Sequence, residues 1–323
     1  MVHVLPKLTV VSKTFCSQMD INQLEVLVAV AQEKSFSRAA ELLNRTQPAV
    51  SQAVRRLELD IGEQLFDRSS KDGTLTSAGE ILLEYAKQML NLRRDAESAV
   101  RELRGLNIGK VTLSANEHTV FALLPMIALF REEHPNIKVE VRRGVASRIP
   151  TEVLGREVEI GAISFKPEDE AVKAVAIVLD ELALIVAPAH PLATQKTVSI
   201  RELGSEIFIA HNAVSPYRAK VLQTFEKFRT PVNIAIELPS LEAIKRLVEQ
   251  NVGVALVPRL TAQAEIERGQ LIALSVKEMR LERRLHLIYR RNSTLSHAAQ
   301  AFLQTARNLQ NVLQNESAKD VST

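Results

Sequence analysis

Polar side chains that could contact nucleic acid recur between residues 47 and 56. They are Gln47, Ser51, Gln52, Arg55 and Arg56, and no acidic residue follows them before Glu58. At this spacing the side chains share one face of an α-helix. Glutamine can pair with adenine and arginine with guanine, and each such contact gives about 1–3 kcal/mol of discrimination. The pattern indicates a helix that reads base edges in a DNA groove.

Two short helices with a tight turn between them would position this face. The first contains the small residue Ala40, where two helices can cross closely, and Asn44 can take the left-handed backbone of the turn. The second helix runs from about Gln47 to Leu59, with Val50, Val54 and Leu57 on its buried face. This arrangement predicts a helix-turn-helix.

A hairpin should follow, because Asp72-Gly73 lies between two short apolar segments. We expect DNA contacts from the turn, the second helix and the hairpin. The residues are Ser37, Arg38, Thr46, Gln47, Pro48, Ala49, Ser51, Gln52, Arg55, Arg56, Arg68, Ser70 and Lys71. The alternative is a helical hairpin with a merely solvated polar face. The turn spacing and the hairpin favour DNA binding.

A capping box at Ser77–Glu80 predicts a long helix that reaches about Arg104. Its apolar residues alternate at spacings of four and three, as in a heptad seam. They are Ala78, Leu82, Tyr85, Met89, Leu92, Ala96, Ala99 and Leu103. The seam predicts a partner helix, most simply the same helix of a second chain. The alternative is packing on the N-terminal domain of the same chain.

Alternating strands and helices follow, and their order is repeated. One β-α-β-α-β block covers 111–164 and another covers 207–257, with further strands at 175–179 and 182–186. This duplication predicts two similar α/β lobes that face one another. We expect a closing helix over Ser296–Leu313 and a disordered tail over 314–323.

A small ligand should bind between the lobes, near strand ends and helix starts. The candidates are Ser114, Asn116, His118, Thr119, Ser147 and Ser164 in the first lobe, and His211, Ser215, Arg218 and Ser240 in the second. Hydroxyls and helix N-termini favour an anion such as a small carboxylate. The alternative is that the serines are helix caps and the histidines are surface residues.

Composition narrows the function classes. The 323 residues carry a net charge of +3, so a DNA-binding role requires a local patch. One cysteine excludes an internal disulfide and a cysteine-rich zinc site. The 11 glycines form no dinucleotide fingerprint, and no apolar run is long enough for a membrane span. Residues 1–18 precede a second methionine, Met19, and we expect a disordered extension or a start-site artefact.

Taken together, these motifs resemble the LysR-type transcriptional regulators, over about 19–313. The matching segments are 35–40 (SFSRAA), 47–52 (QPAVSQ), 56–58 (RLE), Gly62, 65–68 (LFDR) and 75–79 (LTSAG). The resemblance implies a winged helix-turn-helix, a dimerising linker helix and an α/β two-lobed effector domain similar to type 2 periplasmic binding proteins. It also implies promoter DNA, a small-molecule inducer and RNA polymerase as partners, and pairs of dimers forming a homotetramer.

The expected domains are a winged helix-turn-helix at 19–77, a linker helix at 78–106 and an effector-binding domain at 107–313. Within that domain we expect the first lobe at about 107–182 and 284–313, and the second at about 183–283. Two alternative classes are an enzyme that uses the adjacent Glu117 and His118, and a transport-type solute receptor. We expect a cytoplasmic bacterial activator or repressor, with no catalytic residue, metal or cofactor.

Overall fold

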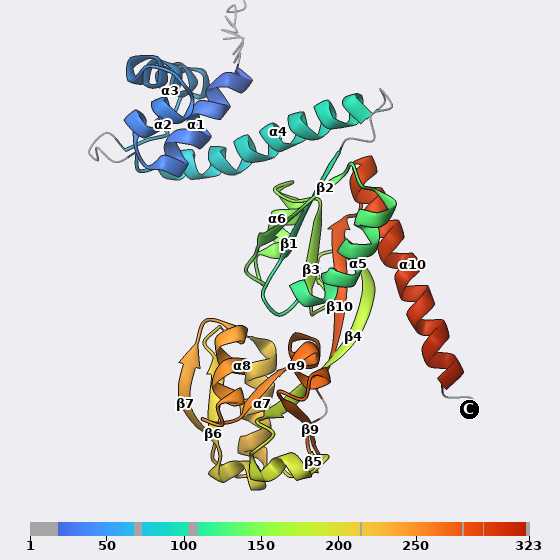
Figure 1. Ribbon diagram of the computed structural model, residues 1–323. Coiled ribbons are helices and arrows are strands. Elements are labelled where there is room, and N and C mark those ends of the chain that lie inside the picture. Colours follow the sequence, from blue (N-terminus) through green and yellow to red (C-terminus); the bar gives the residue numbers. More distant parts are fainter. Residues whose placement is uncertain are drawn as a thin grey trace, which may run out of the picture. The chain divides into compact units, whose positions relative to one another are not determined.

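The computed structural model describes residues 19–67, 73–102, 109–213, 215–279, 281–292 and 294–320 (Figure 1). The chain divides into two compact units between Arg94 and Asp95. No helix in the described ranges is long and apolar enough to cross a membrane.

The N-terminal unit is helical. It contains α1 (Ile21–Glu33), α2 (Phe36–Leu42) and α3 (Gln47–Ile61), and α4 (Ser77–Glu102) begins in it and continues past Arg94. The predicted buried face of α3 is confirmed, since Val50, Val54 and Leu57 are at most 3% exposed. Ala40 is also buried, and Asn44 has a φ of 52° in the turn between α2 and α3. Local spacing was therefore sufficient to predict the helix-turn-helix.

The expected hairpin is paired at its base. Phe66 and Leu75 form an antiparallel bridge, and the amide of Asp67 donates to the Thr74 oxygen at 2.8 Å. Its tip, with Arg68, Ser70 and Lys71, lies outside the described residues. The capping-box prediction at Ser77 was wrong by one residue. The hydroxyl of Thr76 caps α4 instead, accepting from the Gly79 amide at 3.1 Å.

The apolar residues of α4 form two stripes rather than the single predicted seam. Ala78, Leu82 and Leu90 pack against the helix-turn-helix core together with buried Ala86. A second stripe is exposed in the chain and consists of Ile81, Tyr85, Met89, Leu92 and Val100. The alternative of packing on the same chain is thus correct for one stripe only. The predicted positions Ala99 and Leu103 lie outside what is described of the side chains.

The C-terminal unit contains two α/β lobes. The first lobe has β1 (Lys110–Ala115), α5 (Val120–Glu133), β2 (Lys138–Arg143), α6 (Ile149–Leu154), β3 (Ile160–Ile163), β10 (Glu282–Arg290) and α10 (His297–Asp320). The second lobe has β5 (Thr197–Val198), β6 (Ile207–His211), α7 (Pro216–Lys227), β7 (Asn233–Leu238), α8 (Leu241–Glu249), β8 (Ala255–Pro258), α9 (Gln263–Glu267) and β9 (Ile272–Val276). Short 3₁₀ turns lie at Pro191–Thr194, Glu202–Ser205 and Arg259–Ala262.

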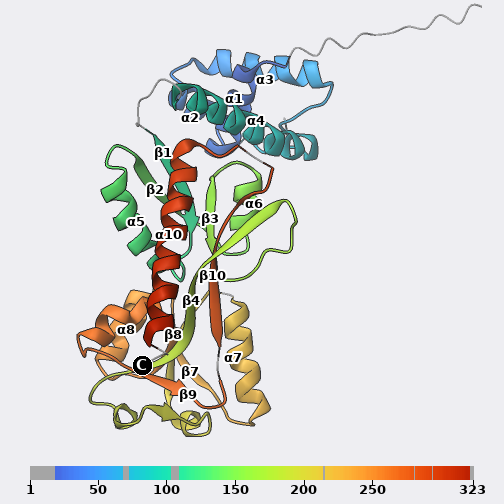
Figure 2. The same ribbon diagram turned by 90° about the vertical axis from the view of Figure 1, so that its right-hand side faces the viewer.

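One long strand, β4 (Val172–Val186), belongs to both lobes (Figures 1 and 2). Its first part pairs with β10 through Glu181, and its last part pairs with β8 and β9 from Leu182 onward. The prediction of two separate strands at 175–179 and 182–186 was therefore wrong. The strand carries the backbone from one lobe into the other without a turn.

The expected duplication is visible in the strand order. In the first lobe β2, β1 and β3 run parallel and β10 joins antiparallel. In the second lobe β7 and β6 run parallel, Val254 bridges β6 just before β8, and β4 joins β8 antiparallel. Parallel strands linked by helices place the β1–α5, β6–α7 and β7–α8 connections at carboxyl ends of strands, where ligands bind in open α/β sheets.

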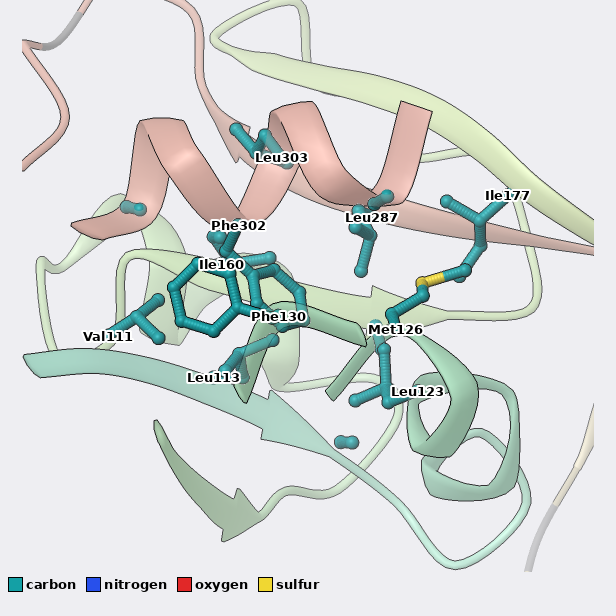
Figure 3. Packing of buried hydrophobic residues seen from close by; sticks show 14 of the residues in the cluster. Val111, Leu113, Leu123, Met126, Phe130, Ile160, Ile177, Leu287, Phe302 and Leu303 are labelled. Carbon is teal, nitrogen blue, oxygen red and sulfur yellow. The ribbon is translucent and has the colours of Figure 1, made fainter. Parts of the chain in front are cut away.

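A hydrophobic core fixes the first lobe (Figure 3). Phe130 of α5 and Phe302 of α10 meet edge to face, with ring centroids 5.2 Å apart. Leu113 of β1 and Leu287 of β10 close the same core from the sheet. Helix α10 continues to Asp320 rather than ending near Leu313 in the expected disordered tail.

Candidate functional site

The predicted DNA-reading face of α3 is exposed to solvent. Gln47, Gln52, Arg55 and Arg56 are exposed, and Ser51 is half-buried. Thr46 precedes the helix but its side chain makes no capping bond, and Pro48 occupies the first turn. The N-terminus of α3 therefore keeps amide groups that can donate to a phosphate.

The basic side chains of this unit differ in whether they form ion pairs or hydrogen bonds with the protein. Arg38 is tied to Glu33, with Nε 3.4 Å from a carboxylate oxygen. Within the described residues, Arg55 and Arg56 have no hydrogen bond or ion pair to the protein. Two unpaired guanidinium groups on one face are well suited to contact bases or phosphates.

A polar cluster joins the two lobes around Glu117, which lies in the β1–α5 connection. One carboxylate oxygen accepts the Leu241 amide at 2.7 Å and the Ser240 hydroxyl at 3.3 Å. The other lies 3.2 Å from Nε2 of His211. All three partners belong to the second lobe, where Ser240 caps α8. A carboxylate of the first lobe thus occupies a helix N-terminus of the second.

Hydrogen bonding determines the tautomer of His211. Its Nδ1 accepts the Ala213 amide at 3.0 Å, so the ring proton is on Nε2 and points to Glu117. The His211 ring also contacts His118, with centroids 4.9 Å apart. Burial, together with His211 and Arg283, lowers the pKa of His118 to about 4. His118 is therefore neutral at pH 7.

Tyr217 makes a second crossing between the lobes. Its hydroxyl donates to the Ser164 backbone oxygen at 2.9 Å. Ser215 caps α7 by accepting the Tyr217 amide at 3.2 Å, while Arg218 donates to the His211 oxygen at 2.9 Å and pairs with Glu237. Ser215 and Arg218 thus hold the β6–α7 connection in position next to the lobe boundary.

Arg283 and Asp180 form a buried pair that sequence reasoning missed. Arg283 is 2% exposed, and its guanidinium lies 3.4 Å from the Asp180 carboxylate. It also lies over the Tyr217 ring, 5.3 Å from the centroid, and donates to the His118 oxygen at 3.4 Å. Burial raises the pKa of Asp180 and lowers the pKa of Arg283. The one feature of the sequence that could have indicated this pair is an arginine, Arg283, within the residues of strand β10.

A buried lysine in α8 was also missed. Lys245 is 3% exposed and lies 2.6 Å from Glu265 and 3.0 Å from Glu242. Its ammonium also faces the Phe121 ring of α5, 5.7 Å from the centroid. The burial of Lys245 could not be predicted from the sequence, because a lysine in a helix is usually exposed to solvent.

The remaining predicted residues have local roles in the structure. Thr119 and Asn116 shape the turn that carries Glu117, and the Thr119 hydroxyl donates to the Ala162 oxygen at 3.1 Å. Ser114 is fully buried and donates to Glu152 of α6 at 2.6 Å. Ser147 is exposed in the turn before α6. The structure therefore brings His118, His211, Ser164 and Ser240 to the lobe boundary, but not Ser114 or Ser147.

Comparison with known proteins identifies the family of both units. Residues 21–80 match "Bacterial regulatory helix-turn-helix protein, lysR family", and residues 104–310 match "LysR substrate binding domain". A "Probable RuBisCO transcriptional regulator" of Synechocystis sp. is 33% identical over 88% of this chain and 84% of its own length. A "RuBisCO operon transcriptional regulator" of Allochromatium vinosum is 29% identical over 88% and 94%.

Solved structures share the fold. CbnR, a LysR family transcriptional regulator, has a TM-score of 0.69 at 20% identity, over 90% of this chain and 99% of its own. The regulatory domain of Synechocystis CcmR, solved with 2-PG, has a TM-score of 0.56 at 24% identity, over 62% and 97%. The relatives are transcriptional regulators and not enzymes, which confirms that class against the catalytic alternative. The chain belongs to the LysR family and is a DNA-binding transcriptional regulator that responds to a small-molecule ligand.

Proposed function

We propose that this regulator contacts promoter DNA through the exposed face of α3 and changes its DNA binding when a small anionic metabolite enters between the two lobes. The hydrogen-bonded cluster of Glu117, His211 and Ser240 carries the second part of this proposal. A carboxylate already occupies the α8 N-terminus, so the chemistry at that point accepts an anion.

The DNA face consists of the predicted residues of α2, the turn and α3. They are Ser37, Arg38, Thr46, Gln47, Pro48, Ala49, Ser51, Gln52, Arg55 and Arg56. The proposal is supported by the exposure of these residues, all exposed except half-buried Ser51, and by the absence of internal partners for Arg55 and Arg56 within the described residues. Arg68, Ser70 and Lys71 would extend the face along the hairpin, outside the part that is described.

The ligand residues proposed here are those at the lobe boundary. They comprise His118, Ser164, His211, Ser215, Arg218 and Ser240, with Asn116 and Thr119 shaping the turn. Ser114 and Ser147 are supported only by their places before a turn and a helix. Phosphorylated or carboxylated metabolites of low mass suit this set of amide, hydroxyl and imidazole groups.

We propose the domain boundaries at 19–77, 78–106 and 107–313, with the lobes divided near 182 and 284. The change of partner along β4 at Leu182 supports the first of these lobe boundaries.

The exposed stripe of α4 supports a homodimer through the linker helix, and pairs of dimers would give a tetramer. A cytoplasmic location would give the protein access to promoter DNA and to metabolites.

Thermal-shift titration of the full chain tests the ligand part. The series contains inorganic phosphate, 2-PG and small dicarboxylates, each with a neutral analogue of similar size as the control. We expect stabilisation by one anion and none by its neutral analogue. Stabilisation by neutral compounds alone would contradict the anionic ligand.

The names of the relatives suggest the promoter region of a RuBisCO operon as a first DNA probe. With this DNA we expect the length of the footprint or the bending of the DNA to change when the ligand is added.

A further inference from the structure

We propose that Glu117 is an internal competitor for the ligand: its carboxylate latches the two lobes together, and the anionic group of the effector must displace it. This inference rests on the proposed anionic ligand. It concerns regulation of that same site, and it assigns to Glu117 a role that differs from contact with the ligand.

Glu117 lies on a turn whose backbone is fixed by hydrogen bonds. The turn that carries it is closed by Asn116, which accepts the His118 amide at 3.0 Å, and by Thr119, which is fully buried and anchored to β3 through Ala162. The backbone of Glu117 therefore has little freedom. The carboxylate crosses to the second lobe from a rigid support.

The second step is the charge balance at the carboxylate. Because Nδ1 of His211 accepts a backbone amide, Nε2 is the ring nitrogen that donates to Glu117. The negative charge is compensated by the Leu241 amide and by the N-terminus of the nine-residue helix α8. These are the donors that a phosphate or carboxylate ligand would use.

A third observation shows a donor at this boundary that is not yet used. Arg283 is almost completely buried, and its Nε has no hydrogen-bond partner among the described residues. Its Nη2 donates to the backbone oxygen of His118, the residue next to Glu117. A buried, incompletely paired guanidinium favours an additional anionic group close by.

The consequence is a competition between two anions for one set of donors. With Glu117 in place, an entering anion meets a like charge at the α8 N-terminus and must break three contacts between the lobes. Displacement would release one of the crossings between the lobes. Ligand entry is thereby coupled to the position of one lobe relative to the other. A ligand-responsive regulator needs a change of this kind in order to alter its DNA binding.

The test uses Glu117→Gln in the full chain, with inorganic phosphate as the probe and isothermal titration calorimetry as the measurement. We expect the variant to bind phosphate about tenfold more tightly, because one competing charge has been removed. Its melting temperature without phosphate should fall, because the latch is weakened. A merely structural role would lower both stability and affinity, so the opposite signs are diagnostic.

Glu140→Gln is the matched control. Glu140 is also in the first lobe, its side chain is 29% exposed against 27% for Glu117, and it pairs with Lys110 and Arg142 within that lobe. The control should leave phosphate affinity unchanged. Glu117→Ala provides a second variant should the glutamine fold poorly, and it too should bind phosphate more tightly.

The outcomes separate the two proposals. Phosphate binding by the unaltered protein, with equal or weaker binding by both Glu117 variants, overturns the competitor role and leaves the anionic ligand intact. Absence of phosphate binding by the unaltered protein and by every variant overturns the anionic ligand, and the competitor role with it. Tighter binding by both Glu117 variants and not by Glu140→Gln supports both.

Discussion

The hydroxyl of Tyr217 in α7 donates to the backbone oxygen of Ser164, directly after β3, at 2.9 Å. This bond joins the second lobe to the first at the lobe boundary, close to the crossing made by Glu117. Because Arg283 lies over the same ring, removing the hydroxyl should leave the ring in place. The two lobes are therefore connected by contacts that can be removed one at a time.

Tyr217→Phe is expected to lower the free energy of unfolding by about 1 kcal/mol, the usual net value of one hydrogen bond. Chemical unfolding of the full chain measures this loss. Tyr289→Phe is the comparison, since its hydroxyl accepts from Arg307 at 3.3 Å within the first lobe. Both variants should lose stability, but only Tyr217→Phe should alter the phosphate affinity. Equal affinity in the two variants would show that the Tyr217 bond does not couple the lobes to the ligand.

The buried pair of Arg283 and Asp180 should be intolerant of single substitutions. Arg283→Met leaves an unpaired buried carboxylate and should cost about 3–5 kcal/mol, whereas Arg246→Met on the exposed face of α8 should have little effect on stability. The double variant Arg283→Met/Asp180→Leu should regain part of the loss. Urea unfolding of the unaltered protein and the three variants measures these differences. A double variant no more stable than Arg283→Met would contradict this account.

His118 should make the protein less stable in acid. Its pKa is lowered from 6.5 to about 4, so the folded protein holds fewer protons than the unfolded chain between those pH values. Stability from this group is complete above pH 6.5 and is lost as the pH falls toward 4. The loss is on the order of 2–3 kcal/mol. Melting temperatures measured across this window should fall less steeply for His118→Gln than for the unaltered protein.

The exposed face of α3 should determine DNA affinity. Gln52→Ala and Arg55→Ala are each expected to weaken specific binding by about 1–3 kcal/mol if they contact bases. Gln32→Ala, exposed on α1, serves as the control. Fluorescence anisotropy with promoter DNA at two salt concentrations separates base contacts from phosphate contacts, because a lost phosphate contact also reduces the salt dependence. Unchanged affinity in both α3 variants would place the reading face elsewhere.

Local pattern was sufficient for the N-terminal unit and for the order of elements in the lobes. The buried face of α3 and the left-handed Asn44 follow from neighbouring residues alone. The continuous strand β4 could not be predicted in this way, because the charged residues Asp180 and Glu181 suggested a break between two apolar strands. Asp180 is accommodated within the strand by Arg283, which lies 103 positions away.

The role of Glu117 could not be predicted for a similar reason. Its partners lie 94 and 124 positions away, and only the folded lobes bring them together. Helix periodicity has a different limit. In α4 two apolar stripes overlap within one sequence pattern, and spacing does not show which stripe meets the chain's own core.

The second α4 stripe gives the last prediction. Tyr85 and Leu92 are 58% and 49% exposed in the single chain, which is unusual for large apolar residues on one helix face. If this stripe meets a second chain, Tyr85→Ala and Leu92→Ala should each weaken dimerisation at least about tenfold, as truncation of an interface anchor does. Glu84→Ala, on another side of α4, should have no effect on dimerisation. Leu82→Ala, which removes a contact with the helix-turn-helix core, should lower the stability of that unit instead. Sedimentation velocity over a range of protein concentrations measures the first effect, and a dissociation constant unchanged by both stripe variants would rule out this face as the dimer contact.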